Sequence, residues 1–99
     1  MLKCVEIIAY SIKRGKLDEF HTIKNQLIEE ARSLDGLISS VTLKSADDED
    51  VFLDKMEWKS KDHAEIGRKD FMNLATSKKF MSLLQGPPMF TSRFEEMLK

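Results

Sequence analysis

The residues from Val51 to Ile66 constrain the fold most, because a complete strand pattern there runs directly into the start of a helix. Side chains of a strand point alternately to its two faces. One face of this strand therefore carries Phe52, Asp54, Met56 and Trp58. The other face also holds apolar residues, and Ser60 can accept hydrogen bonds from the free backbone N–H groups of the helix that follows. The stretch predicts a strand over 51–59 that turns into a helix from Lys61.

The remaining segments are predicted from the same periodicities. Residues 4–13 alternate as a strand, with Glu6, Ile8, Tyr10 and Ile12 on one face. Apolar residues at spacings of three and four predict an amphipathic helix over 16–34, and Gly36 suits the left-handed position that ends it. Residues 37–44 form a second strand. Residues 61–85 are helical, with a second helix starting near Thr76 or Ser77, and 89–97 return as a strand.

This order of elements predicts an α+β fold. Strand, helix, strand, strand, helix, strand implies a four-stranded antiparallel sheet with its helices on one face, in a ferredoxin-like arrangement over a single domain of residues 1–99. The first and third strands are apolar on both faces, so the face without helices needs cover as well. We expect a homodimer through this helix-free sheet face, which closes a dimeric α+β barrel.

Charge and cysteine content exclude several classes of protein. The net charge is −1 with 33% charged residues, which leaves no electrostatic footprint for nucleic acid or an anionic membrane. No segment approaches the roughly 18 apolar residues of a membrane span, and Cys4, the only cysteine, suits a reducing compartment. We expect a cytoplasmic protein. The acidic run 47–50 is interpreted as a solvated hairpin turn, because it lacks the alternating ligands and turn glycine of a calcium loop.

The third strand ends in EWKSKD, with Trp58 near its end and a helix that opens at Ser60. This pattern resembles the antibiotic biosynthesis monooxygenase (ABM) family of dimeric α+β barrels. The turn Arg14-Gly15-Lys16 and the junction 34–37 are also similar to that family. The resemblance covers nearly the whole chain. It implies a cleft between sheet and helices for a flat hydrophobic substrate that reacts with oxygen without a metal or flavin cofactor.

The resemblance assigns particular positions. The family's tryptophan at the end of the third strand matches Trp58, and quinone-forming members carry an asparagine four residues earlier, where this chain has Asp54. An ionised aspartate accepts hydrogen bonds but donates none. Haem-degrading members carry an asparagine and a histidine where this chain has Ile8 and Arg68, so no iron site is expected. With two histidines far apart and one cysteine, no metal-ligand spacing is present either.

The two expected catalytic residues are Asp54 and Trp58, and each has two interpretations. Trp58 either stacks on an aromatic ligand or is a core residue whose indole N–H finds an acceptor. Desolvation in an apolar pocket would make Asp54 a candidate general base. Alternatively, Asp54 pairs with Arg93, Lys78 or Arg68 across the pocket.

Five residues are expected to bind substrate: Phe52, Met56, Tyr10, His63 and Arg93. Tyr10 lines either the barrel interior or the cleft, depending on the register. His63 stands in the first turn of the second helix, as a proton shuttle or as an exposed helix histidine, and the same choice applies to His21.

Two functions remain open. The first is a cofactor-independent monooxygenase acting on a small aromatic or polycyclic phenol, in which Asp54 takes a proton, Trp58 holds the ring, and the resulting anion reacts with oxygen. The alternative is a non-catalytic dimeric barrel that binds a small apolar ligand or another protein. RNA-recognition and acylphosphatase functions are set aside, because the third strand lacks the aromatic and basic pattern of the former and Arg14-Gly15 is a poor anion cradle.

Overall fold

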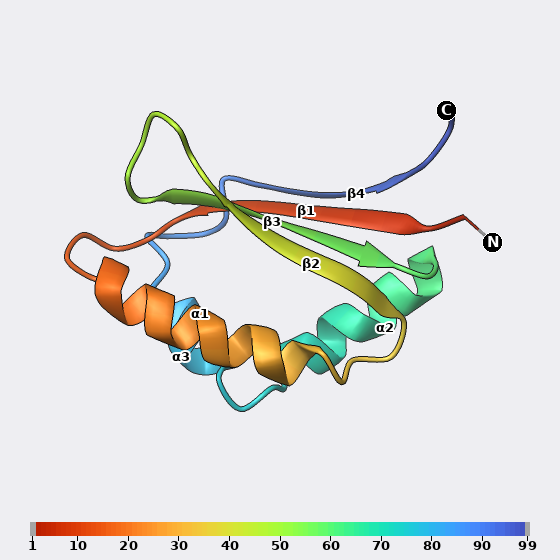
Figure 1. Ribbon diagram of the computed structural model, residues 1–99, viewed down its shortest axis with the longest axis horizontal. Coiled ribbons are helices and arrows are strands. Elements are labelled where there is room, and N and C mark those ends of the chain that lie inside the picture. The colour runs from red at the N-terminus through yellow and green to blue at the C-terminus, as the bar shows by residue number, and fades with distance from the viewer. Residues whose placement is uncertain (1, 99) are drawn as a thin grey trace.

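The computed structural model describes residues 2–98 as a four-stranded sheet with three helices packed on one of its faces (Figure 1). In chain order the elements are β1 (Cys4–Ser11), α1 (Leu17–Ala31), β2 (Leu37–Lys44), β3 (Val51–Trp58), α2 (Lys61–Met72), α3 (Ser77–Ser82) and β4 (Phe90–Glu95). The predicted ferredoxin-like α+β fold is confirmed. None of the helices within the described residues is both long and apolar enough to cross a membrane.

The sheet is antiparallel and has the strand order β2-β3-β1-β4. The first strand therefore lies inside the sheet, between β3 and the last strand. Its register places Ile8 opposite Asp54 of β3 and opposite Thr91 of β4. Since directly opposed residues share a face, Glu6, Tyr10, Asp54 and Met56 all project toward the helices. The predicted faces of β1 and β3 are confirmed.

The core lies between the sheet and the helices. Tyr10, Phe20 and Phe52 form its aromatic part, with the Phe20 and Phe52 ring centroids 4.5 Å apart. At the other end of the sheet, Trp58 is fully buried beneath α2. A Cβ added at Gly67 would lie 2.2 Å from two carbons of the Trp58 ring, so the close contact between α2 and the sheet requires a glycine there.

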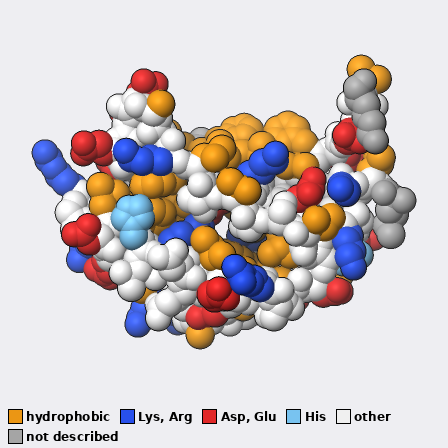
Figure 2. All heavy atoms as spheres, in the orientation of Figure 1, with side chains coloured by type: hydrophobic (Ala, Val, Ile, Leu, Met, Phe, Trp, Pro, Cys, Tyr) orange, Lys and Arg blue, Asp and Glu red, His pale blue; other side chains and the backbone are white. Residues whose placement is uncertain are grey.

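The opposite face of the sheet carries no helix and is largely apolar. We call it the open face; its apolar residues include Val5, Ile7, Ala9, Val41, Leu43, Leu53, Phe90 and Phe94, and it also carries Lys55 and Glu57. Val41, Leu43 and both phenylalanines are about half exposed. Figure 2 shows hydrophobic side chains over the upper side of the molecule, on the side of the sheet away from the helices. Exposed apolar surface of this kind is characteristic of an interaction face.

Several elements are shorter than predicted. The first helix ends at Ala31 rather than at Leu34, because the chain tightens into turns in which the Ser33 hydroxyl donates to the Glu30 carbonyl oxygen. The first strand ends at Ser11, and Ile12 makes an isolated bridge to Leu84 instead. The last strand spans only Phe90–Glu95. The two predicted helices in 61–85 are confirmed.

The junction between α1 and β2 holds the first turn of α2. Gly36 has φ +82°, the left-handed conformation that was predicted for it, and a Cβ there would lie 2.3 Å from the His63 ring. Ser60 caps α2 as expected, since its hydroxyl accepts from the His63 backbone N–H at 3.2 Å. His63 is therefore half-buried against a turn, and not freely exposed.

Candidate functional site

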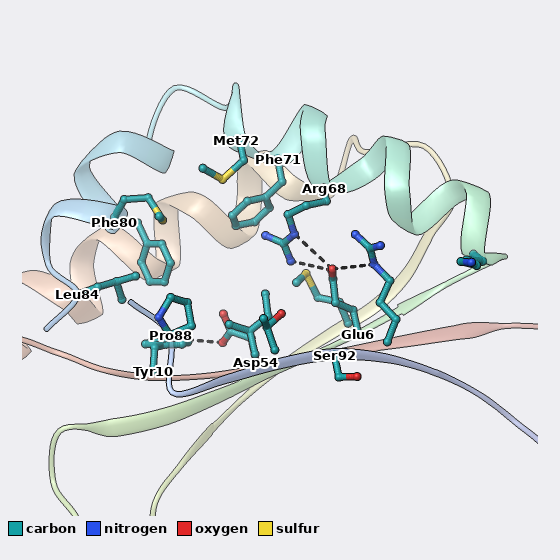
Figure 3. A pocket seen from close by; sticks show the side chains of 16 residues that line it. Glu6, Tyr10, Asp54, Arg68, Phe71, Met72, Phe80, Leu84, Pro88 and Ser92 are labelled. Atoms are coloured by element: carbon teal, nitrogen blue, oxygen red, sulfur yellow. Dashed lines mark hydrogen bonds and ion pairs between the residues drawn. The ribbon is translucent and has the colours of Figure 1, made fainter. Parts of the chain in front are cut away.

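A cavity of about 510 Å³ lies between β1, β4 and the helices α2 and α3. Its size falls within the range of roughly 300 to 1,000 Å³ that is usual for small-molecule sites. At one end it is apolar, where Tyr10, Phe80, Leu84 and Pro88 meet, and at the other end stand Glu6 and Arg68 (Figure 3). Asp54 and Phe71 lie between the two ends. The cavity thus has one apolar end and one charged end.

Asp54 is one of two carboxylates of the lining that are almost completely buried. It is 5% exposed, and its carboxylate accepts three hydrogen bonds from three different elements of structure. Oδ1 accepts from the Tyr10 and Thr42 hydroxyls, both at 2.9 Å, and Oδ2 accepts from the Lys24 ammonium at 2.5 Å. A carboxylate offers about four acceptor positions. By this count, one acceptor position on Oδ2 has no partner among the described residues.

The ion pair of Asp54 corrects the sequence interpretation. The alternative of a pair with Arg93, Lys78 or Arg68 is wrong about the partner, which is Lys24 of α1. Both members are almost completely buried, with side-chain exposures of 9% for Lys24 and 7% for Asp54. The ammonium also lies 4.6 Å from the centre of the Phe80 ring. A buried carboxylate with an equally buried counter-ion carries no net charge into the cavity.

Burial shifts the pKa of the two titratable groups that donate to Asp54, Tyr10 and Lys24. Desolvation, together with the charge of Asp54 and the hydrogen bond to it, raises the pKa of the Tyr10 hydroxyl well above its usual value of 10.0. Desolvation lowers the pKa of Lys24 below its usual 10.5, while the charge and hydrogen bond of Asp54 oppose that shift. Tyr10 therefore stays a hydrogen-bond donor throughout the physiological pH range.

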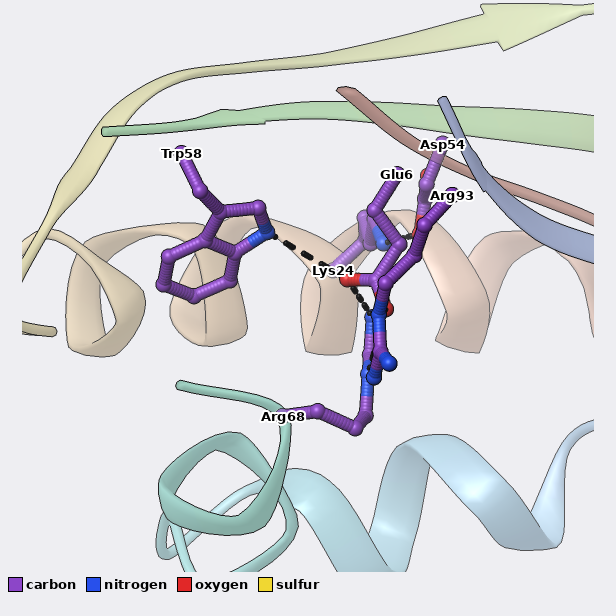
Figure 4. A network of polar contacts seen from close by, with 6 residues as sticks. All are labelled: Glu6, Lys24, Asp54, Trp58, Arg68 and Arg93. Atoms are coloured by element: carbon purple, nitrogen blue, oxygen red, sulfur yellow. Dashed lines mark hydrogen bonds and ion pairs between the residues drawn. The ribbon is translucent and has the colours of Figure 1, made fainter. Parts of the chain in front are cut away.

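Glu6 forms the second polar cluster, at the charged end (Figure 4). Its carboxylate is 3% exposed and accepts from Arg68 Nη2 at 2.7 Å, from Arg68 Nε at 3.4 Å and from Arg93 Nε at 3.3 Å. The indole N–H of Trp58 donates to the same carboxylate at 3.4 Å. Two guanidinium groups thus share one carboxylate, so the cluster carries an excess of one positive charge.

The structure brings together some of the expected site residues and separates others. Asp54, Tyr10, Met56 and Arg93 all line the cavity. Tyr10 thereby faces the cleft on the helix side of the sheet, one of the two positions left open for it. Phe52, His63 and Trp58 are not among the described residues that line this cavity. Phe52 packs behind Tyr10, and the Trp58 indole finds an acceptor within the core.

Three polar residues of the site were not picked out as site residues from the sequence: Glu6, Lys24 and Thr42. Lys24 stands four residues after Phe20 and three before Leu27, so it belongs to the apolar stripe of its helix, and a lysine there is a detectable anomaly. Glu6 likewise interrupts a strand face that is otherwise apolar. Thr42 gives no such signal, because threonine is common in strands.

Chemically, the site can bind an apolar molecule, accept a proton and hold negative charge. The apolar end encloses rings, Asp54 offers an acceptor position, and the arginines supply donors. Within residues 2–98, no group of three or more histidine, cysteine, aspartate or glutamate side chains is arranged to hold a metal ion.

Comparisons with known structures support the same fold. The chain is similar to a conserved protein from Methanosarcina mazei Go1 (TM-score 0.79, 17% identity, covering 98% of this chain and 95% of that one). It is also similar to a protein of unknown function from Nitrosomonas europaea (TM-score 0.74, 17% identity, 100% and 93% covered). A third similar structure is SnoaB, a cofactor-independent oxygenase from Streptomyces nogalater (TM-score 0.72, 9% identity, 98% and 93% covered).

A search among curated proteins found no sequence match. The family model described as antibiotic biosynthesis monooxygenase, however, matches residues 4–68. The match runs from β1 into α2 and includes Glu6, Asp54, Trp58 and Arg68. Because it covers well over half of the sequence, the chain belongs to the antibiotic biosynthesis monooxygenase family.

Proposed function

We propose that the protein is a cofactor-independent monooxygenase that oxidises a small aromatic or polycyclic phenol in the cavity between sheet and helices. The observation that carries the proposal is Asp54, a buried carboxylate beside the apolar end of the cavity, whose fourth acceptor position has no partner among residues 2–98. Membership of the family and the likeness to an oxygenase fold support the same reaction class. Fold alone does not establish chemistry, so the proposal depends on the site.

In the proposed reaction, Asp54 acts as the general base. A substrate hydroxyl donates to the remaining position on Oδ2 and passes its proton to the carboxylate. Lys24 then keeps its positive charge beside a neutral acid, so it offsets the negative charge that has moved to the phenolate. Phe71 and Phe80 hold the ring. Trp58 does not contact the substrate in this proposal; its indole N–H donates to Glu6 and holds that carboxylate in place.

The phenolate is electron-rich and reacts with oxygen directly. One ring carbon loses its single hydrogen atom and gains one oxygen atom as a carbonyl, while the phenol oxygen, whose proton has gone to Asp54, becomes the other carbonyl of a quinone. The second oxygen atom leaves with those two hydrogens as water, so the substrate itself supplies the electrons. We place this reaction in the cytoplasm, where the single buried thiol of Cys4 needs no partner.

We also propose that the protein works as a homodimer through the open face. Its two phenylalanines and the neighbouring aliphatic side chains are apolar and about half exposed, and a two-fold dimer would bury the same patch on both copies. This pairing leaves the cavity on the helix side of each sheet.

The reaction is tested with an oxygen electrode and a panel of hydroxyquinols and anthrones, without added metal or flavin. We expect Asp54→Asn to lower kcat/KM by roughly 100- to 10,000-fold, the usual contribution of a general base, and to remove the acidic limb of the pH profile. Asp70→Asn, which removes a carboxylate from an exposed position of α2, is the control. Unchanged turnover and an unchanged pH profile in Asp54→Asn would rule out Asp54 as the base.

A non-catalytic binding barrel is the alternative function, favoured by the aspartate at a position where quinone-forming relatives carry an amide. It predicts that the same compounds bind and are recovered unchanged, with no oxygen consumed. Mass spectrometry of the recovered ligand separates the two functions.

A further inference from the structure

The charged end of the cavity has more hydrogen-bond donors than its own carboxylate can use. Arg68 uses Nε and Nη2 on Glu6, and Arg93 uses Nε. Among residues 2–98, no acceptor is bound to Arg68 Nη1 or to either Nη of Arg93. A guanidinium group carries five N–H donors in a planar fork that matches a carboxylate. Donors therefore remain available at this end of the cavity.

The charge balance points the same way. Asp54 and Lys24 cancel each other, and Glu6 cancels one of its two arginines. One positive charge is left in the lining, and Lys61 of the same lining is exposed and is paired only at 3.9 Å with Glu65. An uncompensated guanidinium beside apolar walls favours an anionic group on whatever fills the cavity. A single negative charge would complete the balance.

From these donors and this charge, we infer that the natural ligand is an aromatic carboxylate, whose ring system fills the apolar end while its acid group binds Arg93 and Arg68. The register of the strands fixes the distance between the arginine cluster, which would bind the acid group, and Asp54, which would bind the hydroxyl. Glu6 lies opposite Met56, one row along the sheet from Asp54, and rows on one face are about 7 Å apart. The ligand's acid group therefore lies about 7 Å or more from the hydroxyl that meets Asp54. This inference rests on the proposed function for the phenol hydroxyl only, and the carboxylate site can be tested without turnover.

The test compares a hydroxynaphthoate with the corresponding hydroxynaphthamide by isothermal titration calorimetry at neutral pH, where the acid is ionised. The two compounds have similar shapes, but only the first carries a charge. We expect the wild-type protein to bind the acid on the order of tenfold to a hundredfold more tightly, as charge-assisted hydrogen bonds would provide. Arg93→Gln should lose most of that preference, and Arg93→Lys should restore part of it. The amide should bind the wild type and both Arg93 variants with the same affinity.

Two further variants make the test decisive. Lys69→Gln removes a positive charge from the neighbour of Arg68, at an exposed position of α2 that is not part of the cavity lining, and it should leave the preference unchanged. Glu6→Gln removes the carboxylate that occupies both guanidinium groups, so the acid should bind more tightly to it than to the wild type.

The inference is overturned if acid and amide bind equally, if neither binds, or if Arg93→Gln and Lys69→Gln weaken the acid to the same extent. A protein that prefers the acid but consumes no oxygen with any phenol would keep this inference and lose the proposed monooxygenase. If the protein consumes oxygen with neutral phenols but shows no preference for the acid, the proposed monooxygenase is kept and the inference of an aromatic carboxylate is lost.

Discussion

Tyr10 joins the core to the candidate base, since its ring packs among Phe20, Phe52 and Phe80 while its hydroxyl donates to Asp54. It is also the only tyrosine in the chain. Its titration can therefore be followed without interference from another phenol. Because the folded protein holds its proton, the ionisation of this group reports directly on whether the site is intact.

The raised pKa of Tyr10 predicts how stability changes in alkali. The unfolded chain releases this proton near pH 10, whereas the folded protein retains it. Above pH 10 the unfolded state then binds fewer protons, so the free energy of unfolding falls as pH rises. We expect tyrosinate absorbance in the native protein to appear only together with loss of the near-ultraviolet circular dichroism, and in urea to appear near pH 10. A native protein that forms tyrosinate near pH 10 while still folded would contradict this.

At the residue scale, the sequence predicted which side chains face the helices, but it did not predict their partners. The period of two put Asp54 and Met56 on the helix-covered face, where both line the cavity, but it left open on which side of the sheet Tyr10 lies. The pairing of Asp54 with Lys24, however, depends on how far α1 lies over the sheet, and strand alternation carries no information on that. Similarly, Arg68 and Arg93 converge on Glu6 because α2 and β4 both lie close to β1 in space. In sequence, both arginines are more than 60 residues from Glu6.

At the scale of elements, the contact between α2 and the sheet is set by one glycine. Gly67 sits in the middle of α2, where alanine would ordinarily improve helix stability by up to about 1 kcal/mol. The Trp58 ring occupies the place of the missing Cβ. In the sequence alone, a glycine at this place indicates only a weakened helix, because its packing role becomes visible only once the helix is placed over Trp58.

Gly67→Ala is therefore expected to destabilise the protein. Overpacking a core costs roughly 1 to 3 kcal/mol, which exceeds the gain in helix propensity. Urea unfolding measures the effect, and Ile66→Ala, at the exposed neighbouring position, serves as the control for substitution in the same turn. Trp58→Phe combined with Gly67→Ala should recover part of the loss, because the smaller ring frees the space. A Gly67→Ala protein as stable as the wild type would show that α2 can lift off the sheet without cost.

Element boundaries were predicted less well than element types. Every strand and helix was anticipated, yet α1 ends three residues early and β1 two residues early. Apolar periodicity continues to Leu34, which is buried even though it is no longer helical. Burial alone therefore does not mark the end of a helix, because local hydrogen bonds such as that of Ser33 decide it.

At the scale of the whole molecule, the open face decides how the protein exists in solution. If two copies pair through it, Leu53 lies within the apolar part of the contact, since it is flanked by Leu43 and Ala9 on the adjacent strands. We expect the wild type to sediment as a dimer at micromolar concentration, and Leu53→Lys to sediment as a folded monomer, because a buried unpaired charge is costly at an interface.

Ile66→Lys is the matched control for that experiment. Ile66 is an exposed apolar residue, at 61%, but it lies on α2 and not on the open face, so this variant should remain dimeric. A monomeric wild type at micromolar concentration would exclude pairing through the open face at that concentration.

The strand order has a consequence for the time course of synthesis. The first strand to be made, β1, pairs on one side with β3 and on the other with β4. The paired residues of β4 follow those of β1 by 81 positions (Ala9 opposite Phe90) to 91 positions (Cys4 opposite Glu95). Until β4 has emerged from the ribosome, one edge of β1 stays unpaired, and a chaperone that recognises exposed strand edges has a target there. Arg93 arrives on that same strand. In the proposed binding mode, the nascent protein therefore becomes competent to select an acidic ligand only when the last strand has docked.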